Sequence, residues 1–278
     1  MTNDRDFQNI AKQIEVIVII PTKNRPDRLL KALRSVVTQN RKPDLIYVVS
    51  DKGNLCYDKT SLIVKNFENK ANILFITNTR NPGLSGTINT ALYKIKSIQI
   101  NNNPFIAFLD DDDWWDYNYL QECYSIAIEN NSNWVISGLV RYDDNNPNGL
   151  ALNIPESISV DDFLITNPNI QGSNLFVKYN NIMKINGFDE NLQSTTDRDI
   201  CIRLLDINTK YTNLQKHLVH HNAISTYERL STPGSEYKKN GLIAFYKKYK
   251  NRMNEEQKIK FKQRAFNLFK IEISEKDG

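Results

Sequence analysis

The sequence has few cysteines and little excess charge. Its 278 residues include three widely spaced cysteines, Cys56, Cys123 and Cys201, and no C-x-x-C pair. A disulfide framework or a zinc knuckle is therefore not indicated, and this cysteine usage is typical of a reducing compartment. The formal charge of +4 does not favour a strongly basic nucleic-acid binder, so no nucleic-acid partner is expected.

Long hydrophobic runs are also missing. The apolar run Val16 to Ile20 is far shorter than the ~20 residues that a membrane-spanning helix needs. The first ten residues are polar and lack the apolar segment of a signal peptide. These absences predict a cytoplasmic protein. With 40% hydrophobic and 24% charged residues, the chain is expected to fold as one large domain or as a domain with an annex.

The first half of the chain alternates between strand and helix patterns. Apolar, β-branched segments predict strands at 15–21, 44–51, 72–78 and 104–110. Apolar residues at helical spacing predict helices at 27–39, 59–68 and 87–98. This rhythm predicts a doubly wound, mostly parallel α/β sheet, in which ligands bind at the carboxyl ends of the strands.

The second half is less regular. It is expected to contain a strand at 133–144, a turn-rich loop (NNPNG) at 145–149 and a short capped helix at 159–166. A strand, a short helix and a glycine stop follow at 173–187, and a helix covers 197–207. The chain after Thr226 is expected to be helical.

Four consecutive aspartates, Asp110 to Asp113, follow the fourth predicted strand. Adjacent carboxylates repel one another, and a divalent cation relieves this repulsion. Within the run, the pair Asp110 and Asp112 can direct one carboxylate toward a nucleotide ribose and the other toward a metal that bridges diphosphate oxygens. The alternative is a solvated acidic turn, but the position after an apolar strand favours a site.

Three further aspartates occupy positions suited to chemistry. Asp51 ends the second predicted strand, where a carboxylate can accept hydrogen bonds from a base or a ribose; the alternative is a cap or loop residue. Asp197 and Asp199 lie near the start of a predicted helix, where a carboxylate can act as a general base toward an acceptor hydroxyl. Their alternative role is helix capping, with Asp199 and Arg203 paired on the surface.

Two pairs of aromatic residues have open roles. One histidine of the pair His220 and His221 can complete a metal site, although such pairs are more often packed or solvated. The rings of Trp114 and Trp115 can form a wall for a sugar, although tryptophans are more often core residues.

Taken together, these segments resemble glycosyltransferase family 2, whose members have the GT-A fold. The resemblance rests on blocks that occur in the family's order: VIVIIPTKNRPDRLLKALRSV, YVVSDKG, NPGLSGTINTAL, FLDDDDWW, NGFDENLQSTTDRDICIRL and HNAISTYERL. It covers residues 15 to 230. It implies a Rossmann-like, mostly parallel central sheet flanked by helices, followed by a C-terminal helical annex.

The resemblance also implies roles for individual residues. Asp197 would be the catalytic base, and Asp112 and His221 would bind the metal. Contacts to the donor and its nucleotide would come from Pro21, Thr22, Asn24, Arg25, Asp51, Asn81, Gly83, Asn89, Asp110 and Asp111. Contacts to the acceptor or the donor sugar would come from Asp113, Trp114, Trp115, Arg198 and Asp199.

The sequence departs from the family pattern next to the expected base. Thr196 stands where the family has glutamate, so its Glu-Asp motif is only half present. Arg198 places a cation between Asp197 and Asp199. This cation either lowers the pKa of Asp197, which would weaken it as a base, or binds an anionic acceptor or donor.

The resemblance implies a metal-dependent, inverting hexosyltransferase-like enzyme of EC class 2.4. The donor would be a nucleotide-diphosphate sugar, with a UDP-sugar as the first choice, and the metal would be Mn²⁺ or Mg²⁺. The acceptor would be a hydroxyl of a saccharide, lipid carrier, peptide or small molecule. Bacterial polysaccharide or glycoconjugate synthesis is the expected setting, with natural-product or peptide modification as an alternative. A nucleotidyltransferase and a non-catalytic nucleotide-sugar-binding module are further alternatives.

Three regions are expected along the chain. Residues 1–113 would form the nucleotide-sugar-binding half, residues 114–225 the acceptor-binding half of the same GT-A domain, and residues 226–278 a basic, aromatic helical segment. This last segment either packs its aromatic residues on the domain, which is favoured, or lies on the inner face of the membrane as a peripheral contact.

Overall fold

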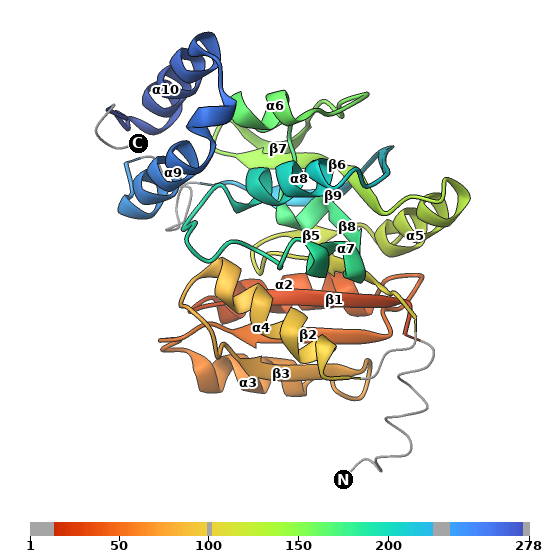
Figure 1. Cartoon of the computed structure of the whole chain (residues 1–278). Coiled ribbons are helices and arrows are strands. Elements are labelled where there is room, and N and C mark those ends of the chain that lie inside the picture. The colour runs from red at the N-terminus through yellow and green to blue at the C-terminus, as the bar shows by residue number, and fades with distance from the viewer. Residues whose placement is uncertain (1–13, 99–101, 225–233, 275–278) are drawn as a thin grey trace.

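The computed structural model describes residues 14–98, 102–224 and 234–274, which form one curved sheet with helices on both faces (Figure 1). Alternate residues of the first strand point to opposite faces. Ile17 and Ile19 join one hydrophobic cluster, whereas Val16, Val18 and Ile20 join the other. A strand buried on both faces needs such a continuous apolar sequence, which the sequence predicted.

Nine strands are found in the described residues, in the order β3-β2-β1-β4-β8-β6-β9-β5, with β7 paired to β6. The first four strands are parallel and confirm the predicted parallel half of the sheet. They are β1 (Val16–Thr22), β2 (Leu45–Ser50), β3 (Ile73–Thr77) and β4 (Phe105–Phe108). The three predicted helices between them are α2 (Pro26–Val37), α3 (Tyr57–Lys65) and α4 (Leu84–Lys96).

The other strands make the sheet mixed, because β8 pairs antiparallel to both β4 and β6, and β9 pairs parallel to β6. This half contains β5 (Trp114–Trp115), α5 (Tyr119–Glu129), β6 (Trp134–Asp143), β7 (Asn146–Ala151), α6 (Val160–Ile165), a 3₁₀ turn (Gly172–Asn174), β8 (Leu175–Lys178), α7 (Tyr179–Lys184), α8 (Thr196–Asp206) and β9 (Tyr211–Asn222). The predicted cap of α6 is confirmed by the reciprocal hydrogen bonds of Ser159 and Asp162.

The predicted loop at 145–149 is wrong. Asn146–Ala151 forms β7, which pairs antiparallel with the end of β6. Gly149 has φ +88°, and a Cβ atom there would lie within 3 Å of Val140 and Tyr142 side-chain atoms. Asparagine, proline and glycine favour turns locally, but pairing with the long strand β6 overrides that preference.

The C-terminal segment is helical where it is described, in α9 (Glu236–Tyr249), a 3₁₀ turn (Lys250–Arg252) and α10 (Glu255–Phe269). Most of its aromatic rings pack inward, and Phe245, Tyr246, Tyr249 and Phe261 are all at most 4% exposed. The favoured alternative, a helical annex packed on the domain, is confirmed for these residues. The segment 225–233 lies outside the described residues, and with it most of the predicted block HNAISTYERL and the proposed boundary at 225.

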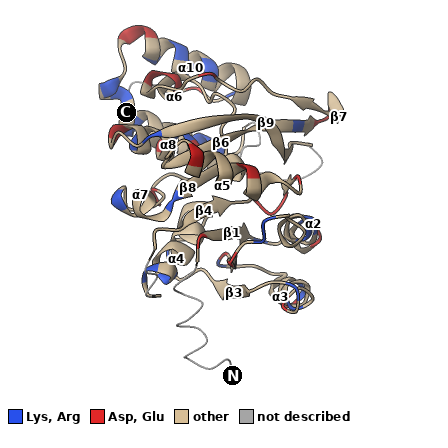
Figure 2. Cartoon of the chain, turned by 90° about the vertical axis from the view of Figure 1, so that its right-hand side faces the viewer, with Lys and Arg blue, Asp and Glu red and all other residues tan. Residues whose placement is uncertain are grey.

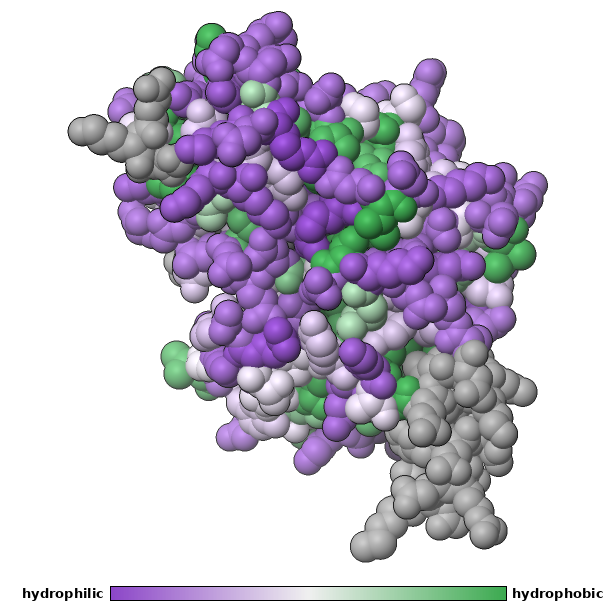
Figure 3. Space-filling model, viewed as in Figure 1, coloured by the Kyte–Doolittle hydropathy of each residue, from purple (hydrophilic) through white to green (hydrophobic). Residues whose placement is uncertain are grey.

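The surface of the annex is mixed. The acidic residues of α10, Glu255 and Glu256, both lie in its first turn, and basic residues follow along the helix (Figure 2). Lys258 and Lys260 pair with these two glutamates. Hydrophobic residues appear only as separate small groups on the face drawn in Figure 3. None of the helices in the described ranges is long and apolar enough to span a membrane. Peripheral membrane contact stays a prediction, which liposome flotation of the full chain tests.

A buried ionic cluster joins the annex to α8. Tyr249 donates a hydrogen bond from its Oη to Asp199 Oδ1 at 2.7 Å, and Lys248 contacts the same oxygen at 2.5 Å. Arg203 holds the other carboxylate oxygen at 2.6 Å. Asp199 is fully buried, so these three donors compensate a charge that would otherwise be costly. The cluster fixes the start of α8 against the annex.

Replacing Tyr249 by phenylalanine should destabilise the fold. The change removes one hydrogen bond to a buried carboxylate, which is worth about 1.5–3 kcal/mol of unfolding free energy. Urea unfolding measures the loss. Tyr237→Phe on the same helix is the matched control, because Tyr237 is 45% exposed. Equal stability of the two variants would show that the hydrogen bond contributes little.

Candidate active site

A cavity of about 610 Å³ opens at the carboxyl ends of β1 and β4. Its lining comes from parts of the chain that are distant in sequence: the strand ends, the turn between β6 and β7, the loop after α6, the start of α8 and the annex. Six predicted site residues line it, namely Arg25, Asp110, Asp112, Asp197, Arg198 and His221. The structure therefore brings together the predicted base, both members of the Asp-x-Asp pair and both predicted metal ligands.

The aspartate run alternates in direction. Asp110 and Asp112 line the cavity, whereas Asp111 and Asp113 are almost fully buried. Asp111 accepts a hydrogen bond from Thr22 Oγ1 at 2.7 Å and an ion pair from Arg25 at 2.6 Å. Burial raises the pKa of Asp111 to about 6, and the charge of Arg25 limits the rise. Asp111 is thus a buried partner of the β1 loop rather than a cavity residue.

Asp113 is bound on three sides by protein. Its oxygens accept hydrogen bonds from Ser173 Oγ at 2.6 Å and from the Asn222 backbone at 3.0 Å, and they lie 3.2 Å from His221 Nδ1. Burial alone would raise the pKa of Asp113, but His221, Ser173 and Asn222 together lower it. Asp113 therefore orients His221 and does not itself line the cavity.

The environment of Asp110 has the opposite effect on its pKa from that of Asp113. Burial, together with the charges of Asp113, Asp112, Asp197 and Asp111, raises its pKa well above the usual value. Asp112 contacts Arg25 Nη1 at 2.7 Å and Arg28 Nη1 at 3.1 Å. Two arginines thus compensate the charge of Asp112, whereas the carboxylate of Asp110 remains repelled by the neighbouring aspartates.

These donors suit a hard divalent cation. Mg²⁺ in particular is held by one or two protein carboxylates, with the remaining positions filled by water and phosphate oxygens. Asp110, Asp112 and His221 line the same cavity, and the repulsion at Asp110 is of the kind that a cation relieves. No group of three or more acidic, histidine or cysteine side chains that could hold a metal gathers in the described ranges.

Asp197 lies in the first turn of α8 and is the candidate base. The turn before it is set by Thr195, whose φ of 65° is left-handed. Burial raises the pKa of Asp197 to about 6, although a backbone hydrogen bond from Gly172 and the charges of Lys238 and His221 oppose the rise. A carboxylate of this pKa is ionised at neutral pH and accepts a proton more readily than an exposed one.

Of the two roles expected of Arg198, a lowered pKa of Asp197 is wrong, because that pKa is raised, whereas binding of an anionic acceptor or donor stays a prediction. Arg198 donates hydrogen bonds to the carbonyl groups of Phe163 at 2.7 Å and Leu164 at 2.8 Å, and its guanidinium lies 4.2 Å from the centre of the Phe245 ring. It makes no marked contribution to the raised pKa of Asp197. Its donors hold α6 and the annex on α8, a role that the sequence spacing did not reveal.

Lys238 is a cavity residue that sequence reasoning missed. It lies on α9, is 8% exposed and makes no ion pair within the part of the chain that the structure describes. Burial, followed by the charge of Arg198, lowers its pKa to about 8, while Asp197 opposes the change. In sequence it is one of many basic residues of the annex, so no local signal marked it.

Several predicted donor-binding residues lie at the same sheet edge but outside the cavity lining. Asp51 accepts hydrogen bonds from Asn78 at 2.8 Å and from the Gly83 backbone at 3.1 Å, and Lys23 lies 3.3 Å away. Burial would raise the pKa of Asp51, but these contacts lower it. Asn24 Oδ1 accepts a hydrogen bond from the Leu55 backbone, and Pro21 is a buried β1 residue.

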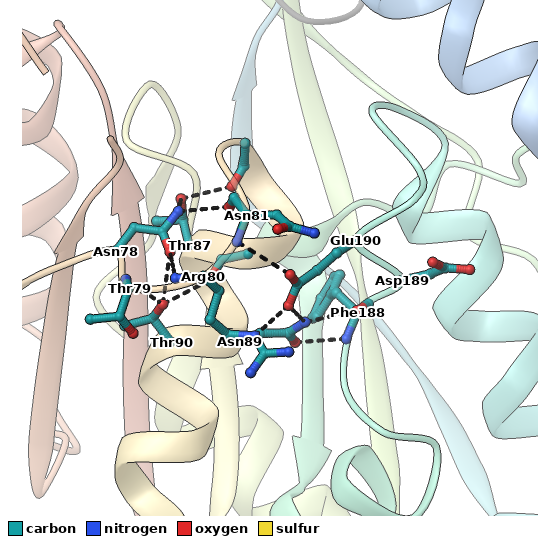
Figure 4. A network of polar contacts seen from close by, with 12 residues as sticks. Asn78, Thr79, Arg80, Asn81, Thr87, Asn89, Thr90, Phe188, Asp189 and Glu190 are labelled. Carbon is teal, nitrogen blue, oxygen red and sulfur yellow. Dashed lines mark hydrogen bonds and ion pairs between the residues drawn. The ribbon is translucent and has the colours of Figure 1, made fainter. Parts of the chain in front are cut away.

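Asn81 and Asn89 act on another segment (Figure 4). The side-chain amide of Asn89 bonds both the backbone N–H and the carbonyl of Phe188, at 2.9 and 2.8 Å. Glu190 accepts hydrogen bonds from Asn89 and the Asn81 backbone and pairs with Arg80. This network holds the loop before α8, so the two asparagines position the segment that leads to Asp197.

The two tryptophans differ. Trp115 is 3% exposed, donates a hydrogen bond to the Ser173 carbonyl and stacks on Tyr119, which places it in the core. Trp114 stacks on His220 with 5.0 Å between ring centres, and the Lys31 ammonium lies 2.8 Å from its ring centre. Neither ring lines the cavity. Asp199 is likewise outside it, in the ionic cluster with the annex.

The comparisons with solved structures agree with this architecture. S. aureus TarS residues 1–349, solved with UDP-GlcNAc, is 18% identical and superposes with a TM-score of 0.66 over 91% of this chain and 72% of that one. A mannosyltransferase from Pyrobaculum calidifontis, solved with GDP-Man and Mn²⁺, is 14% identical, with a TM-score of 0.59 over 91% of this chain and 69% of the other. At these identities the likeness shows the fold alone, and the fold is GT-A.

The sequence comparisons are more specific. "Glycosyltransferase GlyA" of Streptococcus pneumoniae serotype 4 is 30% identical over 115 residues, which make up 41% of this chain and 15% of that protein. The family model described as glycosyl transferase family 2 matches residues 17–187, well over half of the chain. This chain belongs to glycosyltransferase family 2.

Proposed function

We propose that the protein transfers a sugar from a nucleotide-diphosphate sugar to an acceptor hydroxyl, with inversion at the anomeric carbon. One observation carries this proposal: the Asp110 and Asp112 pair and Asp197 line the same cavity. The pair suits the diphosphate side of a donor, and Asp197 suits the acceptor side. The fold supports the proposal, because similar structures were solved with UDP-GlcNAc and with GDP-Man.

In the proposed reaction the acceptor oxygen attacks the anomeric carbon on the face opposite the diphosphate. Asp197 accepts the acceptor's proton while the bond between the anomeric carbon and the diphosphate oxygen breaks. The nucleoside diphosphate leaves with the bonding electrons. Arg25 and Arg28 lie beside Asp112 and can approach the negative charge that develops on the leaving group.

A divalent cation, Mn²⁺ or Mg²⁺, would be held by Asp112 and His221, with Asp110 next to it. It would neutralise charge on the leaving diphosphate. This part of the proposal rests on the acidic cavity wall and on the Mn²⁺ in the mannosyltransferase structure. Asp113 lies 3.2 Å from His221 Nδ1 and orients the ring that lines the cavity.

The proposal extends to the setting of the reaction. A UDP-sugar is the first choice of donor, and bacterial polysaccharide or glycoconjugate synthesis on the cytoplasmic side of the membrane is the first choice of process. The pneumococcal relative and TarS support this choice through their bacterial origin. Because the match covers 15% of the pneumococcal protein, that protein's activity is not transferred.

A donor panel tests the proposed class. UDP-, GDP-, dTDP- and CMP-sugars are added to the protein with and without Mn²⁺, and the melting temperature is measured. One nucleotide class should raise it in a metal-dependent way, because a ligand that binds only the folded state stabilises it. Products distinguish the reactions: a sugar transferase releases nucleoside diphosphate, and a nucleotidyltransferase releases pyrophosphate. No shift with any donor would contradict the proposal.

Replacing Asp197 by asparagine should lower kcat by ~10²- to 10⁴-fold, because the base that removes the acceptor proton is lost. The KM for the donor should change little. Asp206→Asn at the other end of α8 is the matched control, since Asp206 is exposed and pairs with Arg252. Near-normal turnover of Asp197→Asn would exclude Asp197 as the base.

The raised pKa of Asp197 also predicts a pH profile. Because the base must be ionised, kcat/KM should be flat above about pH 6 and fall ~tenfold for each pH unit below it. The residual activity of Asp197→Asn should lack this limb. A limb that persists in the variant would belong to another group, such as Asp110.

A further inference from the structure

The cavity contains a buried cation that the proposed reaction does not use. Lys238 is more than nine-tenths buried and lines the cavity from the annex side. No carboxylate forms an ion pair with it within the described ranges. Its ammonium lies 4.3 Å from the centre of the Phe269 ring, so an aromatic face is its recorded close contact. A buried charge of this kind costs stability unless a bound group compensates it.

The neighbours of Lys238 increase this imbalance. Arg198 and Arg264 line the same cavity, and both oppose the charged form of Lys238. Asp197 is the acid that favours the charged form, and it is the proposed base. Two other carboxylates that line the cavity are already engaged: Asp112 pairs with Arg25 and Arg28, and Asp143 pairs with Arg141.

A second cavity lies beside the first along α10. Its volume is about 370 Å³, it shares Arg264 and Leu268 with the first, and it is also lined by Lys260, which pairs with Glu256. Arg264 is thus the basic residue that lines both cavities. This geometry suits a ligand longer than one sugar, whose anionic group lies between α9 and α10 while its hydroxyl lies near Asp197.

We propose that Lys238 and Arg264 form an anion-binding subsite for the acceptor, which would be a saccharide bearing a phosphate or a carboxylate. This inference rests on the proposed function, because it assigns a substrate class to the same cavity. Lys238 binds the anion as a point charge, and Arg264 offers a guanidinium that lines both cavities. Both are therefore specificity residues, and Asp197 remains the base.

The alternative is that Lys238 acts only through Asp197, whose pKa it lowers. The two ideas differ in what a variant changes. A group that only tunes Asp197 alters the pH profile equally for charged and neutral acceptors. A group that binds the acceptor changes the preference between them.

Calorimetric titration with matched sugars measures this preference on the full chain. The probes are glucose, glucose 6-phosphate and glucuronate, and the donor site is filled with the nucleoside diphosphate that the donor panel identifies. The two anionic probes distinguish a phosphate from a carboxylate. Titrations are repeated without nucleotide, so that the subsite has a result even if no nucleotide binds and the proposed function fails.

An anionic probe should bind ~10- to 100-fold more tightly than glucose, as expected for charge-assisted hydrogen bonds, and salt should weaken this preference. Lys238→Met, which keeps the length of the side chain but removes its charge, should abolish the preference. Arg264→Gln should reduce it, and Lys238→Arg should retain most of it. Lys239→Met is the matched control, since Lys239 is the exposed neighbour on the same helix.

Stability and anion binding should change in different ways in the Lys238→Met variant, so a loss of binding cannot be mistaken for unfolding. Lys238→Met removes an uncompensated buried charge, so its melting temperature should stay equal or rise while anion binding is lost. Equal binding of the three probes, or binding of none, overturns the proposal. A preference that survives Lys238→Met but is lost in Arg25→Gln also overturns it, because the anion then occupies the diphosphate side of the cavity.

Discussion

The repulsion among four adjacent carboxylates governs the arrangement of this site. The run forms a turn that is closed by a hydrogen bond from the Asp113 backbone to the Asp110 carbonyl. In this turn Asp111 and Asp113 point into the protein, where neighbours compensate them: Thr22 and Arg25 for the first, Ser173 and His221 for the second. Asp110 and Asp112 are left at the cavity. The loop after β1 and the end of β9 are thereby tied to the same short segment, which sets the distance between the two halves of the domain.

A similar division occurs two residues apart on α8. Asp199 is fully buried and is compensated by Arg203, Lys248 and Tyr249, so it serves as an anchor for the annex. Asp197 lacks such a set, and its pKa rises to about 6. The same residue type therefore has two roles, which follow from the number of donors that reach each carboxylate. The annex contributes to both, since Lys248 and Tyr249 hold the anchor while Lys238 faces the base.

Local patterns in the sequence were sufficient for the parallel half of the fold and for the Asp110 and Asp112 pair, because a strand period of two and the position of a strand end are local properties. They failed where distant pairing decides the outcome. The segment 146–151 contains turn-forming residues and yet is a strand, because β6 offers it a partner. Asn89 matched a donor-binding motif, but its amide is used by the Phe188 backbone. Lys238 had no signal, since its burial depends on how the annex packs.

The distribution of unpaired charge separates structure from function in this chain. Structural ions, such as Asp199 and Asp113, are buried with several donors, so each contributes to the fold at little net cost. Asp110 and Asp197 are half-buried and Lys238 is buried, but their charges are poorly compensated, and all three line one cavity. A fold retains such uncompensated charges when a ligand supplies the missing partner. In the proposed reaction the acidic members would gain a cation and a proton, and Lys238 would gain an anion, so the two kinds of charge would select opposite parts of the substrates.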